Sequence, residues 1–432
     1  MDRRRQRLVT YTAAAVSLLL MLWGGGCRGR EPEPPIAEPS SNPTASSAAV
    51  TTEAAPTTRP FGETPEEVRA VWVTYAELQT LFGGRSAAQA GEALEALLDR
   101  LSALHINTVF FHVRANSDAY YASDSFAVAA WAGPLLRAGW DPLRCAVEAA
   151  HARGMQLHAW INPFRIGRDA AVAVCGDTFA YNGAYYYIPS SDTVQRQILN
   201  GVRELLDGYA VDGIHFDDYF YPAGAVPAEE PAEFEAEAFA AYREAGGTAA
   251  VGDWRRLQVD RLVAAVCQLA HRSGRVFGIS PAARPEYCRE TLYADVERWM
   301  TVGGYVDYLC PQLYFGLQND SMPFEEVLRR FAAMPRHESV RLYIGLPVYK
   351  AGMRSDSYAG AGAGEWASGG NVLARELRLL RAMPQVDGFA LYASSYLTEE
   401  THPGIGDAAR YEADVVRSEL RELAAALTAR ES

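Results

Sequence analysis

Several protein classes are disfavoured by what this sequence lacks. Its six cysteines include no Cys-x-x-Cys pair, so we interpret most of them as small buried hydrophobic side chains. Its histidines show neither His-x-His nor His-Glu-x-x-His spacing, which counts against a metal-dependent hydrolase. Basic residues number 40 against 53 acidic ones, and the formal charge of −13 argues against nucleic acid as a partner, because phosphates require a basic surface.

The chain begins with a pattern typical of a targeting signal. Arginines within the first seven residues precede an apolar segment over residues 8–23, and small residues then lead to Cys27. This pattern resembles a bacterial lipoprotein signal, which implies a lipid on Cys27 and attachment to a membrane of the cell envelope. Gly24 stands where such signals usually carry Leu, so cleavage and secretion stay open as the alternative. The apolar segment is barely long enough to span a bilayer, which argues against a retained anchor.

The next segment, residues 28–65, is rich in Pro, Ser, Thr, Ala and Glu and has almost no large apolar side chains. Such a segment buries too little surface to fold, so we predict a disordered linker that tethers the rest of the chain. The predicted organisation is a lipoprotein signal peptide over residues 1–27, the linker over 28–65 and one folded domain over 66–432.

The folded part alternates short apolar runs with segments of helical period, the pattern of a parallel sheet with crossover helices. The predicted strands cover residues 68–74, 107–113, 156–161, 211–216, 275–280, 306–313, 342–346 and 388–393. The predicted helices cover residues 87–104, 142–153, 193–206, 254–271, 292–300, 324–334, 371–383 and 408–429. Eight strand–helix pairs predict an α/β fold of the (β/α)8, or TIM barrel, class. An open doubly wound sheet would need a glycine-rich loop after its first strand, and residues 73–77 offer none.

Polar side chains gather where these strands end, which is where such barrels carry their active sites. The clearest case is an apolar strand that runs into Asp217, Asp218 and Tyr219. Adjacent aspartates also cap helices, but the residues that follow are typical of a loop. Alternation along a strand puts side chains two residues apart on one face. The sets expected to face the barrel opening together are His112 with Arg114, His158 with Trp160 and Asn162, and His215 with Asp217.

Short motifs spread over residues 67–396 carry a family resemblance. They include Phe111-His-Val-Arg114, Trp140-Asp-Pro-Leu143, His158-Ala-Trp-Ile-Asn-Pro163, Asp217-Asp-Tyr-Phe-Tyr-Pro222, Phe277-Gly-Ile-Ser-Pro281 and Cys310-Pro-Gln-Leu-Tyr314. Together they resemble the glycosyl-hydrolase-like family 10 of bacterial envelope proteins. The resemblance implies a (β/α)8 glycoside hydrolase, often a lipoprotein, with members that cut peptidoglycan glycan strands stripped of their stem peptides. The segment after Pro281 departs from the family's apolar, aromatic pattern, which puts the substrate subsite built by this loop in doubt.

The acid pair suits the chemistry of glycoside hydrolysis, which needs one group to protonate the leaving oxygen and another to stabilise the oxocarbenium-like transition state. Adjacent carboxylates raise one another's proton affinity, so one keeps its proton at neutral pH. We assign Asp218 as the general acid and Asp217 as its partner. With a 2-acetamido sugar, the sugar's own carbonyl can act as the nucleophile. The side chains assigned to substrate binding are His112, Arg114, Asn116, His158, Trp160, Asn162, His215, Tyr219, Gln312, Tyr314 and Tyr392.

The predicted activity is therefore hydrolysis of a cell-wall glycan built from N-acetylated amino sugars, without a cofactor, in the bacterial envelope. Two alternatives stay open. In a metal-dependent hydrolase or deacetylase, His112, His158, His215 and Asp217 would converge as ligands. In a glycan-binding lipoprotein without catalysis, the same polar and aromatic groups would hold the sugar and leave it intact.

Overall fold

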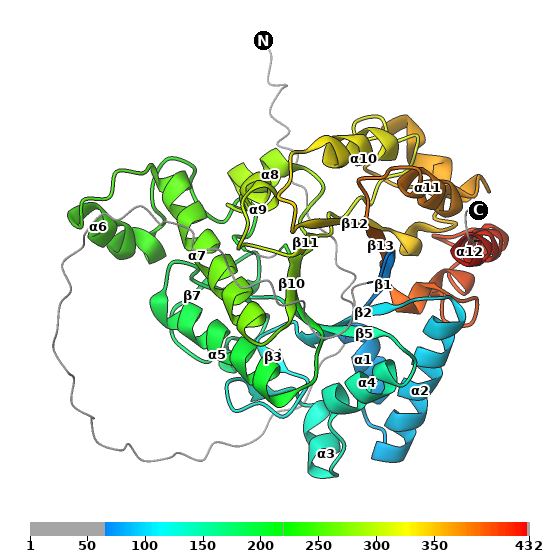
Figure 1. Ribbon diagram of the computed structural model, residues 1–432, viewed down its shortest axis with the longest axis horizontal. Coiled ribbons are helices and arrows are strands. Elements are labelled where there is room, and N and C mark those ends of the chain that lie inside the picture. The colour runs from blue at the N-terminus through cyan, green and yellow to red at the C-terminus, as the bar shows by residue number, and fades with distance from the viewer. Residues whose placement is uncertain (1–64, 219, 430–432) are drawn as a thin grey trace. The chain divides into compact units, whose positions relative to one another are not determined.

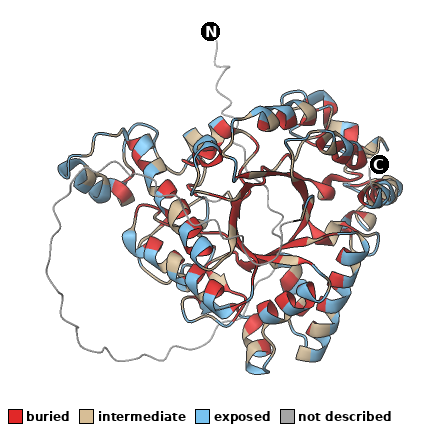
Figure 2. Cartoon of the chain, viewed as in Figure 1, coloured by how far each residue is buried: buried red, intermediate tan, exposed pale blue. Residues whose placement is uncertain are grey.

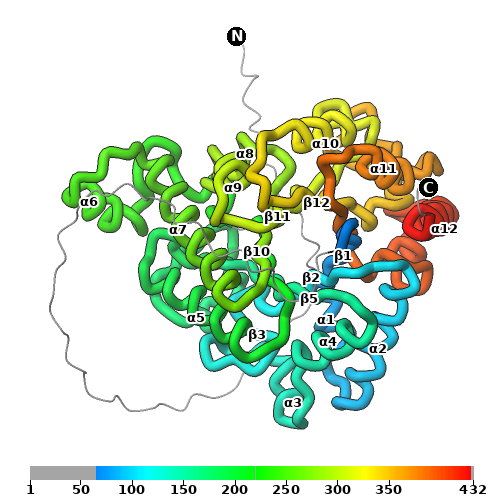
Figure 3. The backbone as a smooth tube through the Cα atoms, viewed as in Figure 1, coloured from blue at the N-terminus to red at the C-terminus, as the bar shows by residue number. Residues whose placement is uncertain are grey.

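Eight short apolar segments form parallel strands that close into a barrel in the computed structural model (Figure 1). Each strand pairs with the next barrel strand along the chain, and β1 pairs with both β2 and β13. Figure 3 shows this closure, with the first strand of the ring in blue beside the last in orange. The (β/α)8 prediction is confirmed. The strands are β1 (Val68–Val73), β2 (Thr108–Arg114), β5 (Gln156–Ile161), β9 (Gly213–Phe216), β10 (Val276–Ile279), β11 (Tyr308–Leu309), β12 (Arg341–Leu346) and β13 (Gly388–Leu391).

The structure describes residues 65–218 and 220–429. The predicted signal peptide, the lipidation residue Cys27 and all but the end of the predicted linker lie outside this part of the chain, and so does Tyr219. Within the described part, no helix combines the length and apolarity needed to cross a bilayer.

Most of the helices surround the barrel and bury an apolar stripe against it. In α2 this stripe includes Leu94, Leu98 and Leu101 at helical spacing, and Ser86 begins the helix with a capping box completed by Gln89. The helices are α1 (Tyr75–Phe82), α2 (Ala87–Ala103), α3 (Ala132–Arg137), α4 (Pro142–His151), α5 (Asp192–Gly208), α6 (Ala236–Glu244), α7 (Val251–Arg272), α8 (Pro285–Thr291), α9 (Val296–Thr301), α10 (Phe324–Ala333), α11 (Val372–Arg381) and α12 (Ala413–Thr428).

Several predicted elements have other bounds in the structure, and for two of them the cause is identifiable. The strand predicted over residues 306–313 is reduced to β11, because Pro311 has no N–H to donate; Gln312 continues the sheet only through isolated bridges to Ala282 and Gly345. The helix predicted over residues 292–300 begins later, as α9, because Tyr293 adopts a left-handed backbone conformation with φ 54° and Asp295 caps the new start.

The barrel has an outer core under the helices and an inner core of rings. The strand residues are almost all buried, as the red ring in Figure 2 shows. The inner core includes Trp72, Phe110, Trp160, Tyr308 and Tyr343. Gly278 makes room for one of these rings, since a Cβ there would lie 2.2 Å from the Tyr308 ring. The interior is therefore a packed core and not a channel.

Insertions at the carboxyl ends of the strands supply small extra elements. A three-stranded antiparallel sheet follows β5, in the order β6 (Arg165–Gly167), β8 (Ala184–Tyr187) and β7 (Thr178–Tyr181). The pair β3 (Asp118–Ala119) and β4 (Ala127–Val128) extends the sheet beyond β2. Short 3₁₀ helices cover Ala170–Val172, Glu233–Glu235, Val348–Lys350, Gly360–Ala367, Ser394–Tyr396 and Pro403–Ile405.

The opposite, amino ends of the strands share a repeated hydrogen-bond device, which we call the amino-end clasps. The clasp residues are Asn107, Asp212, Asp307 and Asp387, and each stands immediately before a barrel strand. Each side chain accepts a hydrogen bond from the N–H of the second residue of the preceding barrel strand, at distances of 2.9, 2.8, 2.8 and 2.9 Å respectively. The clasps thus fix the register at every second strand interface of the ring.

Candidate active site

The acid pair lies at the carboxyl end of β9, where the strand gives way to a loop. The Asp218 backbone N–H donates to Asp217 Oδ1 at 2.8 Å, and the two side chains also hydrogen-bond to each other. Gln312 Nε2 donates to Asp217 Oδ1 at 3.4 Å and to the Ser280 carbonyl at 2.8 Å. Asp217 is buried, whereas Asp218 keeps part of its surface in solvent.

The two carboxyl groups differ in proton affinity for identifiable reasons. Burial raises the pKa of both. For Asp218 the neighbouring Asp217 carboxylate raises the pKa further, well above its usual range. For Asp217 the pKa is also raised, but hydrogen bonds from Asp218, the charge of Arg165 and the Gln312 amide oppose the effect of burial. Asp218 is therefore the member that holds a proton, and Asp217 is the one that ionises first.

Arg165 enters this site from the small sheet that follows β5. It pairs with Tyr186 in the β6–β8 ladder, and its charge lowers the pKa of both Asp217 and His112. Burial raises the pKa values of Tyr287 and Cys288 on α8, and the charge of Asp218 raises them further. Arg165 and α8 are therefore both close enough to the acid pair to interact with it electrostatically.

Three buried side chains beside the acids have polar atoms with no hydrogen-bond partner among the described residues: His112 Nε2, Trp160 Nε1 and Asn162 Oδ1. The His112 and Trp160 rings are stacked, with their centroids 3.7 Å apart. Trp160 pairs with His215 across β5 and β9, so Asn162 and Asp217, two residues further along their strands, stand at the same level. Because the Tyr75 N–H donates to His112 Nδ1 at 3.4 Å, Nε2 carries the proton. We call these three side chains the unpartnered wall; they carry two N–H donors and one acceptor oxygen, an unusual arrangement for buried groups. Burial lowers the pKa of His112, and the nearby Asn162 side chain opposes this shift, so these two groups of the wall also interact with each other.

His215 lies in the barrel interior, below the acids, with both ring nitrogens engaged. Trp72 Nε1–H donates to His215 Nε2 at 3.2 Å, so the His215 proton is on Nδ1 and is donated to Tyr308 Oη at 3.0 Å. Tyr308 in turn donates to His158 Nδ1 at 2.8 Å. Burial lowers the pKa of His158 to about 4 and that of His215 well below its usual range. Both histidines are neutral and buried in the barrel interior; His215 has both nitrogens engaged, whereas His158 Nε2 has no hydrogen-bond partner among the described residues, and their assignment to sugar binding stays a prediction.

Arg114 was expected to share a face with His112, and the structure contradicts this. A β-bulge between the two residues shifts the register, so that Arg114 pairs with the outward-facing Ile161. Its guanidinium lies 4.3 Å from the centre of the Phe126 ring, and it donates to the Pro163 carbonyl at 3.2 Å. Arg114 therefore belongs to the outer core and not to the site.

The remaining sequence-predicted residues divide between the site and its rim. Tyr314 and Tyr392 are partly exposed, and their ring centroids lie 5.6 Å apart. The Tyr349 ring contacts both of them edge-on. These three rings form an aromatic group at the carboxyl ends of β11 to β13. Asn116 is partly buried and packs over Gly167. A side chain at position 167 would place its Cβ only 3.0 Å from Asn116 Oδ1.

The ligand set of the metal-dependent alternative is not brought together. His158 and His215 point their Nδ1 atoms at the same Tyr308 hydroxyl, and the His215 Nε2 is taken by Trp72. Within residues 65–218 and 220–429, only Cys267, His271 and Asp307 form a group of three close metal-ligating side chains, at the amino end of the barrel.

Sequence reasoning counted Arg165 among the polar side chains that follow the strand over residues 156–161 but gave it no role in the site, and it missed Tyr75. Arg165 follows the end of β5 by four residues, and only its pairing with Tyr186 returns it toward Asp217. Tyr75 was hidden because α1 was not predicted, although the Thr74 and Glu77 capping box that begins this helix is a readable signal.

A closed (β/α)8 barrel with two carboxylates at the carboxyl end of one strand has the fold and the acid pair that glycoside hydrolases use. The chain belongs to the glycosyl hydrolase-like 10 family, whose model matches residues 67–359.

Known proteins of similar sequence agree with this assignment. The glycosyl hydrolase DigH of Escherichia coli strain K12 is 29% identical over 351 residues, which cover 71% of this chain and 76% of that protein. The glycosyl hydrolase YngK of Bacillus subtilis is 29% identical over 327 residues, which cover 67% and 62% respectively. The glycoside hydrolase domain of PgaB (BpsB) from Bordetella bronchiseptica shares the fold, with a TM-score of 0.53 at 16% identity over 81% of this chain and 99% of that one.

Proposed function

We propose that this protein hydrolyses glycosidic bonds in a bacterial cell-wall glycan of N-acetylated amino sugars, such as peptidoglycan strands stripped of their peptides. The observation that carries the proposal is the Asp217–Asp218 pair, whose members are pushed to different proton affinities at the carboxyl end of the barrel. Membership of a glycosyl hydrolase-like family supports the reaction class. The choice of a cell-wall glycan rests on what the family resemblance implies, and the paired acids suit a sugar that carries a 2-acetamido group.

In this mechanism Asp218 gives its proton to the glycosidic oxygen as the bond to the leaving chain breaks. The carbonyl oxygen of the substrate's own acetamido group forms the new bond to the anomeric carbon, and Asp217 accepts the acetamide N–H and stabilises the positive charge. Water then attacks the anomeric carbon and gives a proton back to Asp218. Arg165 and Gln312 favour the ionised form of Asp217 throughout.

The unpartnered wall supplies binding groups for the same sugar. His112 Nε2–H and Trp160 Nε1–H can donate to hydroxyl or carbonyl oxygens, and Asn162 Oδ1 can accept from a hydroxyl or amide. The aromatic group of Tyr314, Tyr349 and Tyr392 offers partly exposed rings on which sugar faces can stack. The substrate thus replaces partners that the protein does not provide for itself.

We also propose that the protein works in the bacterial cell envelope, attached to a membrane through a lipid on Cys27 or secreted. The support for this location is the sequence pattern of residues 1–27.

Incubation with amidase-treated peptidoglycan tests the proposal, with shortened glycan chains detected by mass spectrometry. The wild type is expected to shorten the chains, and Asp218→Asn is expected to leave them intact. Asp212→Asn is the matched control, because it changes one aspartate to asparagine at the opposite end of the barrel, where Asn can still accept the Leu157 N–H. Intact chains with the wild type, or equal turnover by Asp218→Asn, would reject the mechanism.

A further inference from the structure

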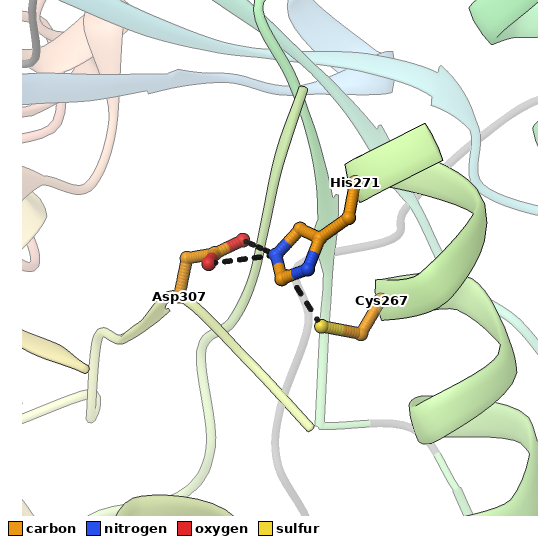
Figure 4. Close-up of side chains that lie close together, drawn as sticks. All are labelled: Cys267, His271 and Asp307. Carbon is orange, nitrogen blue, oxygen red and sulfur yellow. Dashed lines mark hydrogen bonds and ion pairs between the residues drawn. The ribbon is translucent and has the colours of Figure 1, made fainter. Parts of the chain in front are cut away.

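Three metal-ligating side chains converge at the amino end of the barrel, far from the acid pair in the fold. Cys267 and His271 stand one turn apart on α7, and Asp307 precedes β11 (Figure 4). His271 Nε2 lies 2.9 and 3.0 Å from the two Asp307 carboxylate oxygens and 3.7 Å from Cys267 Sγ. A single nitrogen therefore faces both the carboxylate and the sulfur.

A second clasp in the same barrel shows what the pair of His271 and Asp307 does without the sulfur. His151 ends α4 and contacts Asp212 at 2.9 Å, and Asp212 accepts the Leu157 N–H as Asp307 accepts that of Phe277. The residue one turn before His151 is Val147, which is buried like Cys267. A His–Asp clasp thus forms with an apolar neighbour, and the thiol is the feature that distinguishes the Cys267 site.

Two of the three ligand separations lie near those of a tetrahedral metal centre, and the third, between Cys267 Sγ and Asp307, is within 4.8 Å. Zn²⁺ bonds of about 2.0 Å to nitrogen and oxygen and about 2.3 Å to sulfur place N and O about 3.3 Å apart and N and S about 3.5 Å apart. The observed separations of 2.9 to 3.0 Å and 3.7 Å require only small side-chain shifts. A thiolate and a carboxylate also neutralise a divalent charge, and the His271 side chain, 38% exposed, leaves a path for a fourth ligand from solvent.

We propose that Cys267, His271 and Asp307 bind a divalent cation of the Zn²⁺ class, with water as the fourth ligand. The Cys267 thiol loses its proton to solvent when the metal binds. Since the site joins the end of α7 to the start of β11, the metal ties a helix to the sheet and acts on stability, independently of the proposed glycan chemistry.

Cobalt substitution tests the proposal on the full chain without a polyhistidine tag, after treatment with a chelator and desalting. One equivalent of Co²⁺ should produce a thiolate-to-cobalt absorption band, and Zn²⁺ should displace it and raise the melting temperature. Cys267→Val copies the Val147 clasp and keeps the packing, and it should abolish the band and weaken Zn²⁺ binding by more than about 100-fold, beyond the range for changes outside the ligand shell. Val147→Ala is the matched control and should bind as the wild type does.

Two results would overturn the site. The first is wild-type protein with no thiolate band and no Zn²⁺-dependent rise in melting temperature. The second is a band or a thermal shift that persists in Cys267→Val, which would place the metal elsewhere on the chain. Glycan cleavage is not a readout in either case, so failure here leaves the proposed activity untouched.

Discussion

The two ends of the barrel treat buried polar groups in opposite ways. At the amino end, the carboxylates of Asp212, Asp307 and Asp387 each accept a backbone N–H and contact a histidine or arginine side chain. At the carboxyl end, His112, Trp160 and Asn162 keep buried atoms without partners, and two acids crowd each other. Satisfied polar groups hold the fold together, whereas unsatisfied ones cost stability and are retained where a ligand completes them. This contrast supports the placement of the proposed active site at the carboxyl end.

The largest expected effect follows from replacing the proton donor. Asp218→Asn should lower kcat on peptide-stripped glycan by about 10² to 10⁴-fold, the usual contribution of a positioned general acid. Its melting temperature should not fall, since the change removes a carboxyl group that burial disfavours. Steady-state kinetics and thermal unfolding of the same preparation check both parts. A variant that unfolds more easily but turns over normally would contradict the contrast between the two ends.

Replacing its partner should both slow the reaction and move its pH dependence. Asp217→Asn should lower kcat by about 10² to 10³-fold, because the stabilising charge is lost. The Asp217 charge raises the pKa of Asp218, so its removal lowers that pKa, and the protonated acid is lost at a lower pH. The alkaline limb of the kcat profile should therefore shift to lower pH. If the alkaline limb of the kcat profile of Asp217→Asn stays at the wild-type pH, the charge of Asp217 does not raise the pKa of the catalytic acid.

A smaller effect is expected from the unpartnered wall. Trp160→Phe removes the orphaned N–H and should reduce kcat/KM by about 5- to 10-fold, which corresponds to one hydrogen bond of about 1 kcal/mol. Tyr343→Phe is a matched control, since Tyr343 belongs to the same inner core but pairs with Gly388 at the start of β13. If both variants bind and turn over substrate equally, the wall does not contact the sugar.

The smallest effect on catalysis is expected at the amino end, where the cost falls on stability. Asp387→Ala leaves the Leu342 N–H and Arg336 without their acceptor and should lower the free energy of unfolding by about 1 to 3 kcal/mol. Its kcat per folded molecule should match that of the wild type. Denaturant unfolding and kinetics below the transition distinguish the two quantities, and a lost kcat in folded protein would mean that the ends are coupled.

Local patterns in the sequence predict most of the fold and the acid pair. The strands are runs of buried apolar residues with turns between them, and Asp217 and Asp218 stand directly at the end of one run, so no distant contact is needed to place them. Arg114 was placed wrongly because a one-residue bulge reverses the side-chain direction, and alternation alone does not reveal a bulge. Arg165 was noticed as a polar residue after its strand but was given no role, because its position depends on pairing with Tyr186, 21 residues later.

The clasps show a signal that was present but unused. Asn107, Asp212, Asp307 and Asp387 each stand immediately before an apolar strand, and the repetition is visible in the sequence. What the sequence does not contain is the partner, since each carboxylate or amide bonds to a backbone group 30 to 55 residues away. Such a repeat becomes interpretable only once the closed ring defines which strands are neighbours.

The rings of Trp72, Phe110, Tyr308 and Tyr343 act as a plug along the axis of the barrel. A polymer therefore cannot be threaded through the protein or fed from one side to the other. Under the proposed function, a long glycan would therefore bind and leave from one side of the barrel, across the carboxyl ends of the strands.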